Sequence, residues 1–74
     1  MKNLIRRKLR TRFHVTPKVG LPFEGILLAE DSTYAVFGDV VAFPEDGTPT
    51  RCDGDLYVRH ANVAYVQTVK HENE

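Results

Sequence analysis

Apolar and polar residues alternate along much of this chain, and alternation with a period of two is the pattern of a half-buried β-strand. Proline, glycine and acidic residues interrupt the alternation at short intervals and mark turns between strands. The pattern predicts strands over residues 11–16, 22–30, 33–43, 55–59 and 63–69. The sequence is therefore that of a mainly β domain.

The second of these segments is apolar on both of its faces. Phe23, Leu27 and Ala29 point one way, whereas Ile26 and Leu28 point the other way. Strands that are apolar on both faces are usually covered from both sides. We therefore expect this strand to be covered on both sides over part of its length.

Two glycines fall inside the predicted strands rather than between them. Gly25 lies in the second strand and Gly38 in the third. Glycines within long strands often mark bends or bulges. A small sheet needs such bends to close into a barrel, so both positions favour a strongly bent sheet.

The start of the chain has a helical pattern instead. Asn3 can cap a short helix over residues 3–11, with apolar side chains on one side and arginines largely on the other. The apolar residues are Leu4, Ile5 and Leu9, and the arginines are Arg6, Arg7 and Arg10.

The remaining segments are rich in turn residues. Residues 44–54 are predicted to form a mobile loop, residues 60–62 a tight turn, and residues 70–74 a frayed polar tail. The chain is one domain over 1–74, made of a basic helix (3–11), a first motif half (12–43), the loop, a second motif half (55–69) and the tail.

Length and cysteine content point to an oligomer. A chain of 74 residues buries only about 60% of its unfolded surface, and small domains gain stability from disulfides, metals or oligomerisation. Cys52 is the only cysteine, so no disulfide can form within the chain. Proteins without disulfides suit the reducing cytosol, so a cytoplasmic location is expected. No secretory signal and no membrane-spanning segment is visible. Oligomerisation is the stabilising device that remains.

The net charge of zero conceals a partition along the chain. Residues 1–18 carry seven cations and no acid, whereas residues 19–74 carry ten acids and three cations. One end of the domain can therefore present a basic patch to an anionic partner. In the simpler interpretation, these cations only form the solvent-exposed face of a helix and neutralise the negative charge of residues 19–74.

The sequence gives little support to an enzyme. Cys52 lies in an acidic segment, and the histidines at positions 14, 60 and 71 lack the spacing of a metal site. Neither a phosphate-binding glycine loop nor a nucleophile elbow is present. We expect no catalytic residue, metal or cofactor.

Two groups of residues carry a family resemblance. The first group is Gly20, Phe23, Gly25, Leu27 and Asp31, and the second is Arg59-His60-Ala61 with Asn62-Val63. Their order and spacing resemble the two halves of an Sm-type domain, in particular that of the bacterial RNA chaperone Hfq. In this comparison Arg59-His60-Ala61 is similar to the Lys-His-Ala element of Hfq.

The resemblance implies a short N-terminal α-helix followed by a five-stranded, strongly bent antiparallel small barrel of the Sm-like or SH3-like type. It also implies a homo-oligomeric ring, in which the fourth strand of one subunit pairs with the fifth strand of the next. Neither strand carries proline or lysine within its span to prevent this pairing. The candidate interface residues are Leu56, Tyr57, Val58, Tyr65, Val66 and Gln67.

The resemblance further implies binding of single-stranded RNA. The candidate residues form a basic rim, Arg6, Arg7 and Arg10, and a pocket, Arg59, His60 and Asn62. An arginine can stack on a base and pair with a phosphate, and a ring would repeat the rim on every subunit and raise avidity. In the simpler interpretation, Arg59 and Asn62 only flank and hold a tight turn.

Several positions depart from the Hfq pattern. Thr33 occupies the place where Hfq stacks uridine on an aromatic ring, and Tyr34 should turn to the opposite face. The turn also lacks the base-binding asparagine of Sm proteins. On the other ring face, Pro22 and Glu24 stand where Hfq-like proteins offer polar or basic contacts, and a carboxylate repels phosphate. These departures affect base specificity rather than fold.

A second function class stays open. The same small barrel can serve as a protein-interaction or structural module whose basic helix docks onto an acidic partner, without binding RNA. The whole chain also resembles small proteins of actinobacterial bacteriophages, which implies a host protein or a virion component as partner and the host cytoplasm as location. We expect no association with membranes in either case.

Overall fold

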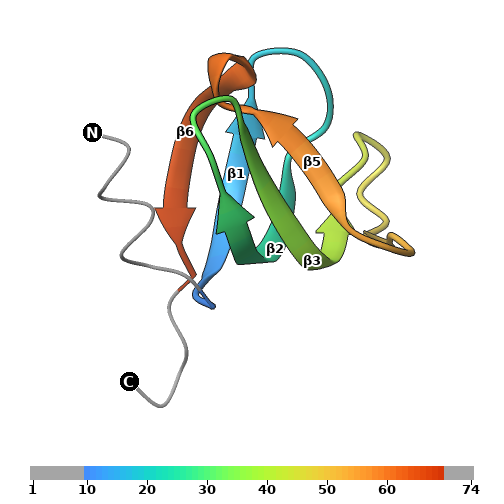
Figure 1. Cartoon of the computed structure of the whole chain (residues 1–74). Helices are drawn as coiled ribbons and strands as arrows, with labels where there is room; N and C mark the ends of the chain where they lie inside the picture. Colours follow the sequence, from blue (N-terminus) through green and yellow to red (C-terminus); the bar gives the residue numbers. More distant parts are fainter. Residues whose placement is uncertain (1–9, 70–74) are drawn as a thin grey trace.

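The structure is a computed structural model and describes residues 10–69 of the chain (Figure 1). It consists of short strands and a single 3-10 turn. The elements are β1 (Arg12–Pro17), β2 (Phe23–Glu30), β3 (Tyr34–Ala42), β4 (Thr50–Arg51), β5 (Leu56–Arg59), the 3-10 helix η1 (His60–Asn62) and β6 (Val63–Thr68). The five strands predicted from the alternation are therefore present within one or two residues of their expected bounds.

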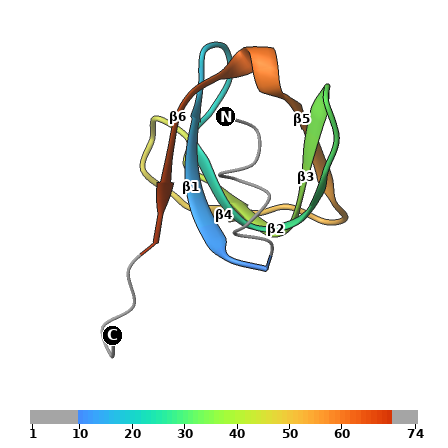
Figure 2. The ribbon, with the colours of Figure 1, turned by 60° about the vertical axis from the view of Figure 1, so that its left-hand side comes forward.

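The strands form one antiparallel sheet that curls into an open barrel (Figure 2). Its order is β4-β3-β2-β1-β6, and β5 pairs with the end of β3 that β4 leaves uncovered. Among residues 10–69, β5 pairs only with β3 and β6 only with β1. The expected bent small barrel is confirmed, and β5 and β6 form its two open edges.

A bulge in β3, opposite Gly25, produces one of the bends. The pairing of β2 with β3 shifts register between Glu24 and Ile26, and Asp39 on the opposite strand has a φ of 51°. A Cβ atom on Gly25 would lie 3.0 Å from the Cβ of Phe37 and 3.2 Å from the carbonyl oxygen of Gly38. Because the two strands approach so closely, a side chain at position 25 would crowd the opposite strand.

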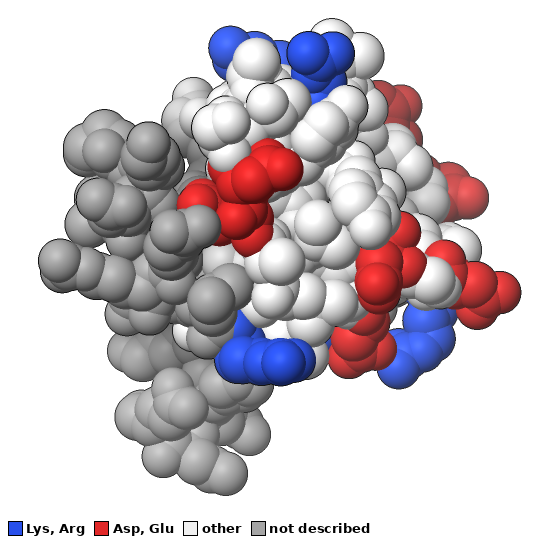
Figure 3. All heavy atoms as spheres, viewed as in Figure 1, with Lys and Arg blue, Asp and Glu red and all other residues white. Residues whose placement is uncertain are grey.

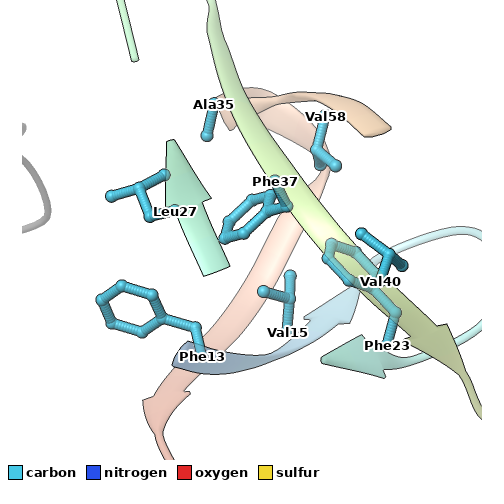
Figure 4. Packing of buried hydrophobic residues seen from close by; sticks show 8 residues of the cluster. All are labelled: Phe13, Val15, Phe23, Leu27, Ala35, Phe37, Val40 and Val58. Carbon is cyan, nitrogen blue, oxygen red and sulfur yellow. The ribbon is translucent and has the colours of Figure 1, made fainter. Parts of the chain in front are cut away.

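The core fills the concave side of the sheet (Figure 4). Its buried side chains come from β1, β2, β3 and β5: Phe13, Val15, Phe23, Leu27, Ala35, Phe37, Val40 and Val58. The rings of Phe23 and Phe37 meet edge to face, with centroids 5.3 Å apart. Val40 follows Phe37 by three residues because of the bulge in β3. The other seven are inward positions of the period-two alternation, so the hydrophobic pattern determines which face of each strand is buried.

The second strand departs from its predicted pattern near its end. Phe23 and Leu27 are buried as expected, but Ala29 is exposed. The register shifts between Leu27 and Ala29, and this irregularity removes Ala29 from the core side. Ile26 and Leu28 are half-buried on the other face, so the expectation of cover on both sides holds in part.

The tight turn predicted over 60–62 is confirmed and is one turn of 3-10 helix. Two further expectations are corrected. The predicted loop 44–54 contains the two-residue strand β4. The helix predicted over 3–11 falls mostly outside the described residues, but Arg10 has a φ of 69°. That backbone conformation is left-handed, so a right-handed helix cannot continue through Arg10. Residues 70–74, predicted as a tail, also lie outside the described range.

Within residues 10–69, none of the elements is a helix long and apolar enough to cross a membrane.

Candidate functional site

The turn between β2 and β3 is built on Asp31. Its Oδ1 accepts hydrogen bonds from the backbone N–H groups of Thr33 (2.8 Å) and Tyr34 (2.7 Å). The N–H of Asp31 donates in return to the carbonyl of Tyr34 (2.9 Å). The bonds from Tyr34 and Thr33 hold the pKa of the Asp31 carboxyl below its ordinary value. Asp31 therefore stabilises the turn as an anion.

His60 joins η1 to this turn. Its backbone N–H donates to the carbonyl of Thr33 (2.9 Å), and its Nε2 lies 2.8 Å from the carbonyl oxygen of Asp31. A carbonyl only accepts, so Nε2 carries the proton in this contact. The same nitrogen lies 3.8 Å from Oε2 of the buried Glu30 side chain. His60 thus fixes the end of β5 beside the β2–β3 turn.

Asn62 ties the other end of η1 to the loop between β1 and β2. Its Oδ1 accepts from the N–H of Val19 (3.1 Å) and its Nδ2 donates to the carbonyl of Val19 (3.0 Å). Its own carbonyl accepts from the N–H of Lys18 (2.6 Å). The structure brings the side-chain amide of Asn62 to the backbone, as in the turn-holding interpretation.

An exposed surface of two tyrosines and one arginine lies beside these contacts. Tyr34 is paired directly with Arg59 across β3 and β5, and Val36 is paired with Tyr57. The guanidinium carbon of Arg59 lies 6.0 Å from the centre of the Tyr34 ring, and the rings of Tyr34 and Tyr57 are 6.4 Å apart at 77°. We call Tyr34, Tyr57 and Arg59 the aromatic platform.

The sequence predicts the aromatic platform only in part. It predicts Arg59 as a binding residue, expects Tyr34 to turn to the opposite face, and assigns Tyr57 only to the ring interface. Tyr57 is 66% exposed as a residue and Tyr34 is 38% exposed. The signal was available in the alternation, because Tyr34 and Tyr57 each flank a core residue, Ala35 and Val58 respectively.

The candidate basic rim is only partly visible. Arg6 and Arg7 lie outside the described residues, and Arg10 is exposed, with its backbone N–H donating to the carbonyl of Leu27 (2.7 Å). Figure 3 shows basic side chains at opposite ends of the viewed face and acidic side chains between them. The surface of the described part is therefore mixed in charge on this face.

A cluster of charged side chains covers the outer face of β1, β2 and β3. In this cluster Nη1 of Arg12 lies 3.2 Å from Oδ2 of Asp39, and Nε of Arg12 lies 3.5 Å from Oε1 of Glu24. Nη2 of Arg51 lies 2.7 Å from Oδ1 of Asp39. The Nδ1 of His14 is 3.4 Å from the other oxygen of Glu24. Glu24, where the sequence suggested repulsion of phosphate, is thus held between a guanidinium and an imidazole.

The candidate interface residues lie on the two open edges of the barrel. Tyr57, Tyr65 and Gln67 are exposed, and Leu56 and Val66 are half-buried against the core. Val58 points into the core with only 7% exposure. Its side chain is therefore buried within its own subunit, and only its backbone lies on the edge of β5.

The described residues offer little for metal chemistry. Among residues 10–69, no group of three or more His, Cys, Asp or Glu side chains is placed to hold a metal ion. Cys52 is exposed, and its backbone N–H donates to the carbonyl of Val40 (2.8 Å).

Compared by sequence, the chain matches no family model and no curated protein. Compared by structure, it is similar to several Sm proteins. A heptameric archaeal Sm protein has a TM-score of 0.78 at 19% identity, covering 92% of this chain and 98% of that chain. The SmAP1 heptamer of P. aerophilum has a TM-score of 0.81 at 18% identity, covering 96% and 95%.

A third similar structure is the Sm protein of Pyrococcus abyssii in complex with a uridine heptamer. Its TM-score is 0.75 at 25% identity, covering 92% of this chain and 96% of that chain. All three similarities extend over almost the whole of both chains. The chain therefore has an Sm-like fold, as the resemblance in its sequence implied.

Proposed function

We propose that this Sm-like chain assembles into a homo-oligomeric ring and binds single-stranded RNA, as a binding protein rather than an enzyme. The similar structures support this proposal, because two are described as heptamers and the third was solved with a uridine heptamer. The observation that carries it here is the exposed Arg59 beside Tyr34, where the β2–β3 turn meets η1.

The ring would form by pairing of the open edges. Each of β5 and β6 has one partner strand among residues 10–69, and neither carries proline or lysine. Head-to-tail addition of β6 to the β5 edge of the next subunit would satisfy backbone groups on both strands and would close if the rotation permits. Tyr65 and Gln67 would then be covered.

RNA would contact two features of the ring. One is the Arg59 and His60 pocket, in which Arg59 supplies both charge and a stacking surface. The other is the Hfq-like basic rim of Arg6, Arg7 and Arg10, whose cations would pair with phosphates. His60 would act mainly by holding the pocket together, because its Nε2 is bonded to Asp31.

The test is a fluorescence anisotropy titration of labelled U-rich and A-rich single-stranded RNA at low and physiological salt. The mass of the protein in solution is measured on the same sample. Saturable binding by an oligomer, with log affinity falling linearly with log salt concentration, is the expected result. A monomer, or an oligomer without any affinity for RNA at low salt, would contradict the proposal.

A second function is favoured by one observation. Val19 and Leu21, in the loop between β1 and β2, are 78% and 46% exposed. Apolar side chains on an exposed loop suit a protein partner, so a protein-interaction or structural module, phage-encoded and acting on a host or virion protein, is the alternative. Saturable binding of a protein that RNA does not compete away would favour it.

A further inference from the structure

Two aspartate–glycine pairs lie in the turn-rich part of the chain that follows β3. One pair, Asp46-Gly47, precedes β4, and the other, Asp53-Gly54, lies between β4 and β5. All four residues are exposed. The bond between aspartate and glycine can rearrange without an enzyme, because glycine has no side chain to keep its backbone nitrogen away from the preceding carboxyl group. Both pairs are therefore candidate sites of a covalent modification.

The rearrangement uses only groups of the chain and water. The glycine nitrogen attacks Cγ of the protonated aspartate carboxyl, a C–N bond forms, and the hydroxyl of the carboxyl leaves as water together with the N–H proton. Water then adds to the backbone carbonyl carbon of the aspartate in this succinimide ring and breaks the bond of that carbon to the nitrogen. The product is an isoaspartyl linkage, in which the former backbone carbonyl is a free carboxyl group and the backbone is longer by one methylene.

Space and backbone conformation do not distinguish the two pairs. Gly47 has a φ of 87° and Gly54 has a φ of 77°. Apart from its chain neighbours, a Cβ atom placed on either glycine would meet no heavy atom within 4 Å. The approach to both glycines is therefore open.

Hydrogen bonds protect the first pair. The N–H of Gly47 donates to the carbonyl of Pro44 (2.9 Å), and Oδ1 of Asp46 accepts from the N–H of Thr48 (3.0 Å). The attacking nitrogen and the attacked carboxyl are thus both held by other partners in the turn. These hydrogen bonds oppose closure of the succinimide ring at position 46.

The second pair has no such protection. Among residues 10–69, the N–H of Gly54 and the carboxyl of Asp53 take part in no hydrogen bond and no ion pair. We propose that Asp53-Gly54 is a site of spontaneous isoaspartate formation in this protein and that Asp46-Gly47 is protected by its turn. This modification site does not depend on whether the chain binds RNA.

The modified bond lies in a segment that is anchored at both ends. The N–H of Cys52 donates to the carbonyl of Val40 (2.8 Å), and Leu56 pairs with Phe37 at the start of β5. Both anchors lie on β3, so the residues between them span a fixed distance. An extra methylene in this segment displaces the start of β5, and the modified chain is therefore less stable than the unmodified chain.

The experiment incubates the full chain in a warm, mildly acidic buffer, which keeps part of the carboxyl groups protonated. Peptide mapping by mass spectrometry separates isoaspartate from aspartate by retention time at equal mass. We expect isoaspartate to form at position 53 at least about fivefold faster than at position 46, because two hydrogen bonds protect the latter. Equal rates, or a faster reaction at position 46, would overturn the inference.

A sample unfolded in urea is the control for local sequence. Its turn is lost, so the difference in rate between the two positions should disappear. A difference that persists in urea would show that the local sequence, and not the hydrogen bonds of the turn, decides the rate. Absence of isoaspartate at position 53 of the folded chain, when the unfolded sample reacts, would also overturn the inference.

Two matched variants test the effect on β5. Asp53→Glu keeps the charge, but its longer side chain would have to close a larger ring, so it should not react. We expect the parent and Asp46→Glu to lose thermal stability during the incubation, whereas Asp53→Glu keeps it. If Asp53→Glu loses as much stability as the parent, isoaspartate at position 53 is not the cause, and the proposed displacement of β5 is wrong.

Discussion

Replacing Gly25 with alanine tests whether the tight bend of β2 supports the fold. The new Cβ would lie 3.0 Å from the Cβ of Phe37, 3.1 Å from Cγ2 of Val40 and 3.2 Å from the carbonyl oxygen of Gly38. The first and last of these atoms cannot turn away, because one is the root of a buried side chain and the other is backbone. The sheet itself must therefore shift.

The expected loss follows from two opposing terms. Overpacking a core costs about 1–3 kcal/mol, and the lower entropy of the unfolded chain with alanine offsets about 0.4–1 kcal/mol. The net loss is about 1–2 kcal/mol, which lowers the Tm of a domain of this size by about 5–15 °C.

Gly38→Ala is the matched control. Its Cβ would lie 2.8 Å from Cδ1 of Leu28, which is a shorter distance than any at Gly25. That atom is the far end of a flexible, half-buried side chain, however, and it can rotate away. We therefore expect Gly38→Ala to change the free energy of unfolding by less than about 1 kcal/mol, close to the entropic offset.

Thermal and urea unfolding, followed by circular dichroism at one protomer concentration, measure both variants. The concentration must be fixed because dissociation of an oligomer contributes to its apparent stability. If Gly38→Ala loses as much stability as Gly25→Ala, distance alone decides the cost, and the argument from fixed and flexible neighbours is wrong.

Three further predictions concern the basic rim and the ends of η1. The double variant Arg6→Ala, Arg7→Ala should weaken RNA binding and reduce the slope of log affinity against log salt concentration by about 1.4, because two phosphate contacts are lost. The mass of the oligomer should not change. An unchanged affinity would refute the proposal that the basic rim binds RNA. Asn62→Ala should lower the free energy of unfolding by about 1 kcal/mol, because it removes two hydrogen bonds to the backbone of Val19 whose exposed groups water can then solvate. Urea unfolding that matches the parent would show that these two bonds do not contribute to stability. Folding lowers the pKa of the Asp31 carboxyl from 3.8. The stabilisation by ionised Asp31 is therefore present above pH 3.8 and is lost as the pH falls through the pKa of the folded state. The stability difference between the parent and Asp31→Asn should shrink below about pH 4, and a difference that stays constant between pH 7 and pH 3 would contradict this.

The strands were predictable because local signals determine them. Alternation fixed the inward faces of Phe13, Val15 and Phe37, and glycine at position 25 marked the bend. Ala29 could not be placed, because its exposure results from a register shift that depends on β3. The two residues of β4 lie in a turn-rich segment, and only their pairing with Val41 and Ala42 makes them a strand.

The candidate site was predictable in its residues but not in its contacts. Arg59, His60 and Asn62 could be selected from the sequence, yet their partners lie far away along the chain. Asn62 bonds to Val19, and His60 bonds to the turn at Asp31. Such contacts depend on how the sheet closes, and no local pattern in the sequence encodes that closure.

The pairing of β1 with β6 also constrains the order of events during synthesis. β1 is the first strand of the sheet to leave the ribosome, and Phe13 pairs with Thr68 near the end of the described chain. One edge of β1 therefore stays open until β6 has emerged. β2, β3 and β5 can pair earlier, since their partners lie closer in the sequence. Closure of the barrel therefore waits for β6, and its long-range pairing favours slow folding.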